Sequence, residues 1–347
     1  MMNFKTFSKF FDFLPPELLH SLFIGFLKTQ LYKTNNSFEN LKIKVFGNEF
    51  KNPLGLAAGF DKNAEVIKGA INLGFGFLEL GTVTPMPQYG NQKPRVFKIP
   101  EIEAVIQRLG FNNKGVEEFL DKLKKAQKIK SILGVNIGKN KNSKDLISDY
   151  NFLYQKLEAY SDYITINISS PNTENLRSFH NENELNDLLY AIKKEKVSLK
   201  TSVPTVLKIS PDINDKEISN IIEIIKKYDI EGIIISNTTD KNREKLLDTK
   251  KNEEGGLSGK PIKEISTKLI KKFYSGLNKK ITIIGVGGID SGEAAFEKIT
   301  AGASAVQLYT GMVYKGPGVA REIKKELISI LKNEKVKRIT DIIGISA

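Results

Sequence analysis

The 347-residue chain contains no cysteine, no tryptophan and only two histidines. Without cysteine it forms no disulfide, offers no thiolate to a metal and has no thiol nucleophile. His20 and His180 alone cannot build a multi-histidine metal centre, so we expect no metal site. Any redox chemistry therefore requires a bound cofactor.

Long apolar runs are also missing. No stretch reaches the roughly 18 residues that would cross a bilayer, and a mean hydropathy of -0.26 is typical of a globular protein that is soluble or lies on a surface. The net charge of +13 suits a nucleic acid or anionic lipid, but the lysines are scattered through Lys-, Glu- and Asn-rich helices. We interpret most of this charge as solvated surface and expect no nucleic-acid partner.

The first forty residues differ in pattern from the rest. Apolar residues recur at helical spacing over residues 4–14, Pro15 and Pro16 stop that helix, and the spacing resumes over residues 18–27. These helices lack the features of a signal peptide and are too short to span a bilayer. They predict a helical hairpin over residues 1–40, which either caps the main core or lies on a membrane surface.

From residue 41 onward, short runs rich in Val, Ile and Leu alternate with segments of helical periodicity. The runs are continuously apolar, as expected for strands buried on both faces. Eight are present, at residues 54–58, 75–80, 132–137, 163–168, 205–209, 232–236, 281–286 and 305–309. This repetition predicts an α/β fold, a (β/α)8 TIM barrel over residues 41–347. A doubly wound open sheet is the alternative, although no G-x-G-x-x-G motif follows the first strand.

Polar and glycine residues gather just after the C-terminal ends of these runs. In a barrel such positions converge on one mouth. Glycine, asparagine and serine also turn the chain, so each alone is weak evidence, but turns do not require lysines directly after apolar strands. The residues concerned include Ala58, Gly59, Lys62, Thr82, Asn136, Asn167, Ser170, Lys208, Ser236, Asn237, Thr238, Gly288, Tyr309 and Thr310.

Three glycine-rich stretches predict a phosphate-binding cradle. Residues 287–292 lead from the seventh run into a helix, Gly311 follows the eighth run, and a loop at residues 255–260 follows the sixth. Free backbone N–H groups and the positive end of that helix would bind phosphate at the place where barrels commonly bind it. We therefore expect a cofactor that carries phosphate.

Two lysines at the predicted mouth need partners. The ammonium of Lys208 would form either a structural ion pair, with Asp61 or Asp212, or face an electron-rich cofactor ring that becomes negative on reduction. Lys62 is equally suited to hold a substrate carboxylate. Nearby amide side chains would bind a planar, amide-like ring or merely cap turns: Asn136, Asn167, Asn172 and Asn237.

Seven stretches between about residues 44 and 323 carry a resemblance to a known family. They read NPLGLAAGFDKNAEVI, GTVTPMPQYGNQKPRVFKIPE, RLGFNNKG, GVNIGKNK, NISSPNTENLR, GGLSGKPI and IIGVGGIDSGEAAFEKITAGASAVQLYTG. In content and order they resemble the class 2, quinone-dependent dihydroorotate dehydrogenases, as does PPELLH near the N-terminus. That family is an FMN-bearing (β/α)8 barrel that oxidises dihydroorotate to orotate in pyrimidine biosynthesis.

The resemblance implies roles for residues at the mouth. Ser170 matches the catalytic base of the family; class 1 relatives use cysteine there, and this chain has none. The residues implied to hold FMN are Ala58, Gly59, Lys62, Thr82, Asn136, Asn167, Lys208, Ser236, Gly259, Gly288, Tyr309 and Thr310. Those implied to contact dihydroorotate or orotate are Lys62, Gln107, Arg108, Leu109, Gly110, Phe111, Asn167, Asn172, Asn237 and Thr238.

The resemblance also implies a second half-reaction, in which a membrane quinone takes electrons from the flavin through a tunnel between the N-terminal helices. The candidates for the tunnel wall are His20, Leu18, Leu22, Lys98 and Tyr309. The hairpin would then contact an anionic lipid surface, and we expect a monomer. The absence of a transit peptide favours the cytoplasmic face of a bacterial inner membrane.

Three departures and two rival hypotheses remain. Gln107 stands where asparagine is usual, Lys98 replaces an arginine and so loses its planar fork, and Ser236 stands where threonine is common. One rival is another FMN barrel acting on a dihydropyrimidine or dihydrouridine, although such enzymes generally rely on a cysteine acid. The other is a non-enzymatic barrel that binds RNA or a membrane surface through its charge, which explains no strand-end residue.

Overall fold

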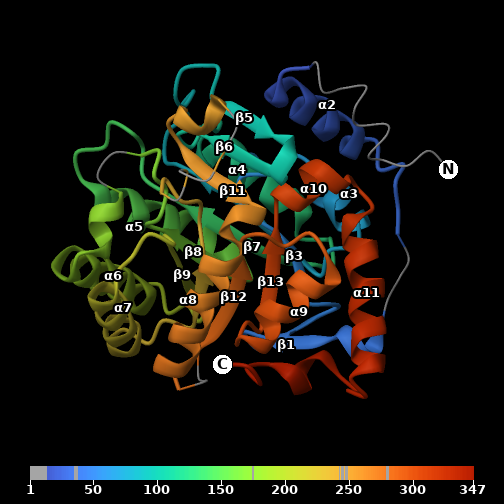
Figure 1. Ribbon diagram of the computed structural model, residues 1–347. Coiled ribbons are helices and arrows are strands. Elements are labelled where there is room, and N and C mark those ends of the chain that lie inside the picture. The colour runs from blue at the N-terminus through green and yellow to red at the C-terminus, as the bar shows by residue number, and fades with distance from the viewer. Residues whose placement is uncertain are drawn as a thin grey trace.

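Eight parallel strands close into a barrel at the centre of this computed structural model (Figure 1). The structure describes residues 14–34, 38–173, 176–241, 243, 246, 249–278 and 281–347. The barrel strands are β3 (Leu54–Leu56), β4 (Phe77–Val83), β7 (Ile132–Ile137), β8 (Tyr163–Asn167), β9 (Thr205–Ile209), β10 (Gly232–Ile235), β12 (Thr282–Val286) and β13 (Ala305–Leu308). Each overlaps one of the eight predicted runs, so the (β/α)8 fold is confirmed. The alternative, a doubly wound open sheet, is wrong because the strands close into a barrel.

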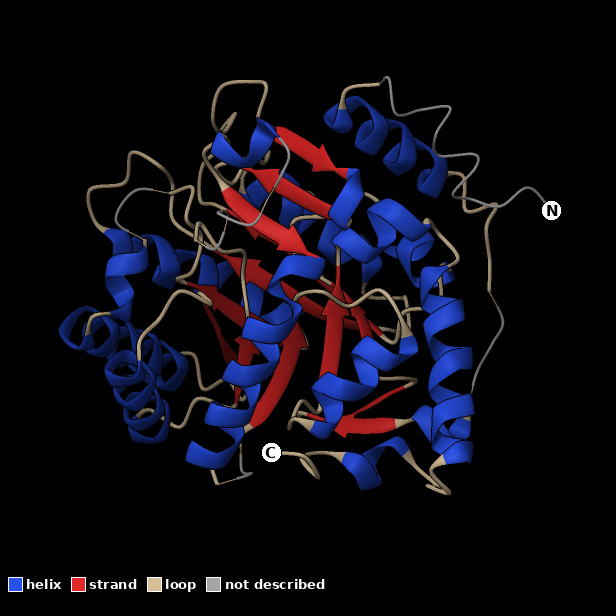
Figure 2. Cartoon of the chain, viewed as in Figure 1, coloured by secondary structure: helices blue, strands red, loops and turns tan. Residues whose placement is uncertain are grey.

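Helices form the outer layer around the strands (Figure 2). They are α3 (Ile67–Asn72), α4 (Val116–Ala126), α5 (Leu146–Leu157), α6 (Glu182–Ser198), α7 (Asp215–Lys227), α8 (Lys263–Gly276), α9 (Gly292–Thr300), α10 (Thr310–Lys315) and α11 (Val319–Asn333). α7 shows how the sequence specifies one of them. Asn214 and Glu217 form a capping box at its start, and isoleucines at helical spacing bury its inner face.

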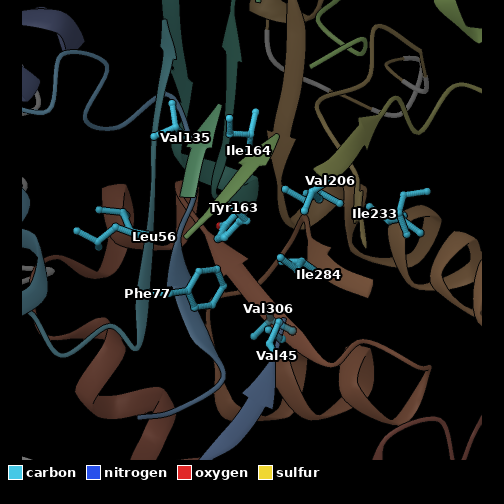
Figure 3. Packing of buried hydrophobic residues seen from close by; sticks show 14 of the residues in the cluster. Val45, Leu56, Phe77, Val135, Tyr163, Ile164, Val206, Ile233, Ile284 and Val306 are labelled. Atoms are coloured by element: carbon cyan, nitrogen blue, oxygen red, sulfur yellow. The ribbon is translucent and has the colours of Figure 1, made fainter. Parts of the chain in front are cut away.

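Aromatic rings fill the floor of the barrel, among the strand valines and isoleucines shown in Figure 3. Phe77 and Tyr163 occupy space that inward-facing Gly55 and Gly134 leave free, because a Cβ at either glycine would collide with a ring. The hairpin of β1 (Ile43–Val45) and β2 (Asn48–Phe50) closes the floor from below, where the ring of Phe46 lies 5.4 Å from that of Tyr163. The C-terminal ends of the strands are therefore the open end.

A small antiparallel sheet lies above this open end (Figure 1), and the sequence did not predict it. It contains β5 (Val96–Ile99), β6 (Ala104–Gln107) and β11 (Gly256–Gly259). Residues 255–260 were expected to form a loop, and that expectation is wrong, because residues 256–259 pair with β6 as a strand. A separate apolar cluster that includes Ile106 and Leu257 holds the sheet together.

The N-terminal segment is described from residue 14. The first predicted helix, residues 4–14, lies almost wholly outside the described residues, whereas the second is α2 (Pro16–Lys28), which begins at a proline suited to a first helical position. α2 lies beside the open end of the barrel (Figure 1) and buries Ile24 and Leu27. Of the helices described, none has the length and apolar character needed to cross a membrane. The division of the chain at residue 40 stays a prediction.

Candidate active site

The strand ends surround one cavity at the mouth of the barrel. Predicted residues from widely separated parts of the chain meet there, because parallel strands deliver their C-terminal ends to the same edge. The predicted residues that line the cavity are Ala58, Gly59, Lys62, Thr82, Gln107, Leu109, Gly110, Phe111, Asn167, Ser170, Asn172, Lys208, Ser236, Asn237, Thr238, Gly259, Gly288, Tyr309 and Thr310.

Two predicted mouth residues do not line the cavity. Asn136 is fully buried beneath it, and its Oδ1 accepts hydrogen bonds from Thr82 Oγ1 (2.6 Å) and Asn167 Nδ2 (3.0 Å). Arg108 turns away, with Nη1 donating to Glu253 Oε2 at 2.8 Å. Asn136 therefore acts on the cavity through its neighbours, and Arg108 braces the loop that carries Leu109 to Phe111.

Ser170 lies in a turn that hydrogen bonds hold rigidly. Its Oγ, on a side chain only 6% exposed, accepts from the backbone N–H of Asn172 at 3.2 Å. The Asn172 side chain donates across to the backbone oxygen of Gln107 at 3.0 Å. Next to it, Ser169 Oγ accepts from Asn237 Nδ2 at 3.0 Å. The turn after β8 is thus fixed to the loops after β6 and β10.

Thr238 adds a free polar group to this wall. Its hydroxyl oxygen is buried and has no hydrogen-bond partner among the described residues, although the residue lines the cavity. A buried hydroxyl without a partner costs free energy unless a ligand or water satisfies it. Thr238 Oγ1 is therefore placed to bind a polar ligand group.

Lys62 contributes a cation on another wall of the cavity. Burial, with the nearby charge of Arg95, lowers the pKa of Lys62 to about 8. An ammonium in this position is protonated at neutral pH and gains most from an anionic ligand that restores its lost solvation. A carboxylate is the simplest such ligand.

Arg95 joins α2 to the loop between β4 and β5. Its Nε and Nη2 donate to the two oxygens of Glu17 on α2, over 2.8–3.2 Å, and its Nη1 donates to the backbone oxygens of Tyr89 (2.6 Å) and Asn91 (2.9 Å). Although burial opposes the effect, Arg95 holds the pKa of Glu17 below its ordinary value. This two-pronged pair fixes α2 against the barrel mouth.

A series of ring contacts runs from α2 to the cavity. The centroid of Phe60 lies 5.1 Å from that of His20, 5.9 Å from Phe23 and 5.9 Å from Tyr309, which lines the cavity. Burial and the charge of Lys62 lower the pKa of His20 to about 4, so its ring is neutral at pH 7. The sequence did not single out Phe60, although it lies within the predicted strand-end stretch.

The other candidates for a tunnel wall lie around this series. Leu18 and Leu22 are 46% and 53% exposed, so they form part of the outer surface of α2 rather than the cavity lining. The ammonium of Lys98 lies 5.5 Å from the ring centroid of Tyr314, and Tyr314 lines the cavity. Ring contacts thus connect α2 to the cavity at Tyr309, and the tunnel stays a prediction.

The partner of Lys208 differs from the two acids considered. Lys208 Nζ lies 3.7 Å from Glu79 Oε1, inside the barrel. Asp61 instead accepts backbone N–H groups at the start of α3, and Asp212 pairs with Arg177 at 3.1 Å. One feature of the sequence could have indicated this partner: Glu79 is an acidic residue within the otherwise apolar strand FLELG.

Backbone groups form a cradle at the outer end of the cavity. Gly288 has φ +69° and a Cβ there would strike the backbone of Lys263, while a Cβ at Gly311 would strike the backbone oxygen of Ile289. The N-terminus of α9, expected to bind phosphate, is already occupied, because the Glu326 carboxylate accepts its first N–H and Ser291 Oγ caps it. The cradle is therefore limited to the backbone at Gly288 and at the start of α10.

The fold and cavity together define a (β/α)8 barrel with a polar, cation-containing mouth and a backbone cradle at its edge. The family model described as Dihydroorotate dehydrogenase matches residues 40–331. The chain is 46% identical to a dihydroorotate dehydrogenase (quinone) of Bartonella tribocorum, in an alignment that covers 94% of this chain and 92% of that protein. It is 42% identical to the mitochondrial dihydroorotate dehydrogenase (quinone) of Mus musculus, over 96% of this chain and 87% of that protein.

Solved structures agree with these sequence comparisons. DHODH from Eimeria tenella, in complex with ferulenol, superposes with a TM-score of 0.93 and 36% identity, covering 96% of both chains. This chain belongs to the dihydroorotate dehydrogenase family.

Proposed function

We propose that the protein oxidises (S)-dihydroorotate to orotate in pyrimidine biosynthesis, using FMN, and passes the electrons to a membrane quinone. One observation carries the proposal. Ser170, Lys62 and the amide side chains face the same cavity as Lys208 and the Gly288 cradle. A base, a cation for a substrate carboxylate and a site for a phosphate-bearing ring therefore meet in a single place.

The residues present fit FMN. The backbone N–H groups near Gly288 and Thr310, two residues that line the cavity, would hold the phosphate. Lys208, Asn167 and Thr82 would meet the polar edge of the ring at the inner end of the cavity. When bound, FMN supplies the acceptor for the hydride that leaves the substrate.

Ser170 is the proposed base that removes the substrate proton. A serine hydroxyl is a weak base at its ordinary pKa, so its own proton has to pass to another acceptor in the closed site. Thr173, three residues further on, has a buried hydroxyl oxygen with no hydrogen-bond partner among the described residues. It is the first candidate for a relay that would take the proton from Ser170, directly or through water, while its own hydroxyl proton passes on to solvent water.

Lys62, Asn172 and Asn237 are the proposed groups that orient the substrate. The ammonium of Lys62 would bind the carboxylate, and the two amides would contact the planar ring, since each can donate and accept. The bonds from Asn172 to Gln107 and from Asn237 to Ser169 hold these side chains in place before substrate arrives. Such preorganisation favours a reacting geometry.

The proposed quinone route approaches from α2. His20 and Tyr309 lie on the ring series through Phe60, and the exposed Leu18 and Leu22 suit an apolar lipid boundary. We place the protein, as a peripheral monomer, on an anionic membrane surface at the cytoplasmic face of a bacterial inner membrane.

The purified protein provides a direct test. It is expected to be yellow, to release FMN on denaturation, and to lose its visible colour under anaerobic conditions when dihydroorotate is added but not when NADH is added. A short-chain quinone should restore the colour. Colourless protein that cannot be loaded with FMN, or bleaching by NADH alone, would contradict the proposal.

A further inference from the structure

Glu79 is a carboxylate at the centre of the barrel that the proposed reaction does not use. It lies on β4, is 1% exposed, and follows Phe77 on the same inward-facing side of the strand. Barrel interiors are usually filled by branched apolar side chains, and an unpaired buried carboxylate costs several kcal/mol. A charge at this position therefore requires an explanation beyond packing.

Four other strands of the barrel each direct one polar group at Glu79. The contacts to its two oxygens are Asn136 Nδ2 from β7 at 2.7 Å, Gln307 Nε2 from β13 at 2.7 Å, Tyr163 OH from β8 at 3.4 Å and Lys208 Nζ from β9 at 3.7 Å. Three of these partners lie below the cavity, but Lys208 lines it. Glu79 thus lies directly behind the cation that faces the proposed cofactor.

Asn136 carries the influence of Glu79 to the cavity by a second route. Because its Nδ2 donates to Glu79, its Oδ1 is turned toward the mouth, where it accepts from Thr82 and Asn167. Both of those residues line the cavity. One carboxylate therefore orients an amide network and a lysine that would contact the same ring.

We infer that Glu79 is a positioning residue that holds Lys208 and balances its charge, so that Glu79 offsets the effect of the Lys208 cation on the reduction potential of the bound flavin. The inference rests on the proposed FMN. A flavin gains negative charge at N1 on reduction, which a nearby cation favours and a nearby carboxylate opposes. With both side chains charged, their effects largely cancel at the ring.

The sign of each substitution follows. Glu79→Gln keeps the shape and removes the negative charge, which leaves the ammonium uncompensated, so the flavin potential should move to more positive values. Lys208→Met removes the cation and should move the potential to more negative values. The double variant Glu79→Gln/Lys208→Met removes both charges and should return close to the wild-type potential, because neither charge then acts on the ring. It should also fold, since replacing a buried pair by neutral residues is commonly tolerated.

The measurement is an anaerobic equilibrium titration of full-length, FMN-loaded protein against a reference dye, with flavin affinity followed by fluorescence. Asp162→Asn is the matched control. Asp162 precedes β8 at the opposite end of the barrel, where its carboxylate accepts the backbone N–H of Leu133 at 2.7 Å. The Asp162→Asn substitution also removes one negative charge, but far from Lys208, so we expect no shift in the flavin potential.

Equal potentials in wild type and Glu79→Gln would overturn the inference, as would an equally large shift in Asp162→Asn. If Glu79→Gln does not fold, Lys208→Met and the double variant still decide, because the inference requires the single change to lower the potential and the double change to restore it. Wild-type protein that binds no flavin would overturn the proposed function and this inference together, whereas unchanged potentials in a yellow protein overturn this inference alone.

Discussion

The cavity has two unlike sides. The serine side consists of Ser170, Asn172, Asn237 and Thr238, and amide and hydroxyl hydrogen bonds join the turn after β8 to Gln107 at the end of β6 and to Asn237 after β10. The helix side reaches the cavity through Tyr309, and behind it the rings of His20, Phe23 and Tyr309 each contact the ring of Phe60. The difference matches two tasks, since removing a proton needs rigid polar groups and receiving an apolar acceptor needs an apolar approach. One barrel mouth would therefore separate the two proposed half-reactions by the kind of surface that each meets.

Ser170→Ala should have the largest effect on a rate, and it should slow only the half-reaction that takes place on the serine side. Loss of a general base is expected to slow flavin reduction by dihydroorotate by about 10²–10⁴-fold, while reoxidation by quinone is unchanged. Stopped-flow absorbance of the flavin measures both steps separately. Equal slowing of the two steps would show that the serine side is not confined to the first half-reaction.

Phe60→Leu should produce a smaller effect with the opposite selectivity. The substitution keeps an apolar side chain but removes the ring contacts to His20, Phe23 and Tyr309, each worth about 0.5–1.5 kcal/mol. We expect reoxidation by a short-chain quinone to become on the order of tenfold slower, corresponding to about 1.4 kcal/mol. Reduction by dihydroorotate should stay within about twofold, and a larger loss there would contradict the separation.

The pH dependence should distinguish the two sides further. Lys62 has a pKa of about 8, lowered by burial and the charge of Arg95, so the free enzyme loses this cation as the pH rises through that value. The kcat/KM for dihydroorotate, measured with the free enzyme as reference, should therefore fall above about pH 8. Reoxidation should lack a His20-dependent change between about pH 6 and 8, since burial lowers the pKa of His20 to about 4.

Lys62→Arg is the control for this assignment. Arginine stays charged well above pH 8, so the alkaline fall should move upward or disappear even if the longer side chain weakens binding. An unchanged fall at the same pH would assign it to another group.

Lys298→Met should leave both half-reactions unchanged and affect stability alone. Lys298 is buried between α8 and α9, and its Nζ donates to Lys263 O and Thr267 Oγ1. Burial lowers its pKa from 10.5 to about 7, so between these values the unfolded chain binds more protons and the unfolding free energy rises with pH. Below pH 7 the full penalty applies, at most roughly 5 kcal/mol.

Methionine avoids that penalty, so the gain in Tm over wild type should be larger at pH 6.5 than at pH 9.5. Thermal unfolding followed by circular dichroism at the two pH values measures it. An equal gain, or a loss, at both would mean that the ammonium is not the source of the cost.

The sequence predicted the barrel because its strands are continuously apolar and regularly spaced, and it predicted the mouth because polar residues follow those strands. It did not predict Glu79 as the partner of Lys208, since the two lie 3.7 Å apart only after the barrel closes. Nor did local patterns reveal β11, a glycine-rich segment that becomes a strand only by pairing with the distant β6. The carboxylate of Glu326 at the start of α9 is a similar contact between remote elements.

The pairing of Arg95 with Glu17 has a mechanical consequence. From the same loop, Asn91 Nδ2 donates to the backbone oxygens of Arg108 (3.0 Å) and Asn172 (3.4 Å), so a continuous set of polar links leads from α2 to the turn that holds the serine. A shortened protein that lacks α2 would lose more than the proposed contact with the membrane. We expect the affinity for dihydroorotate to fall as well, because Arg95 would lose Glu17 and the loop that it holds would no longer be fixed.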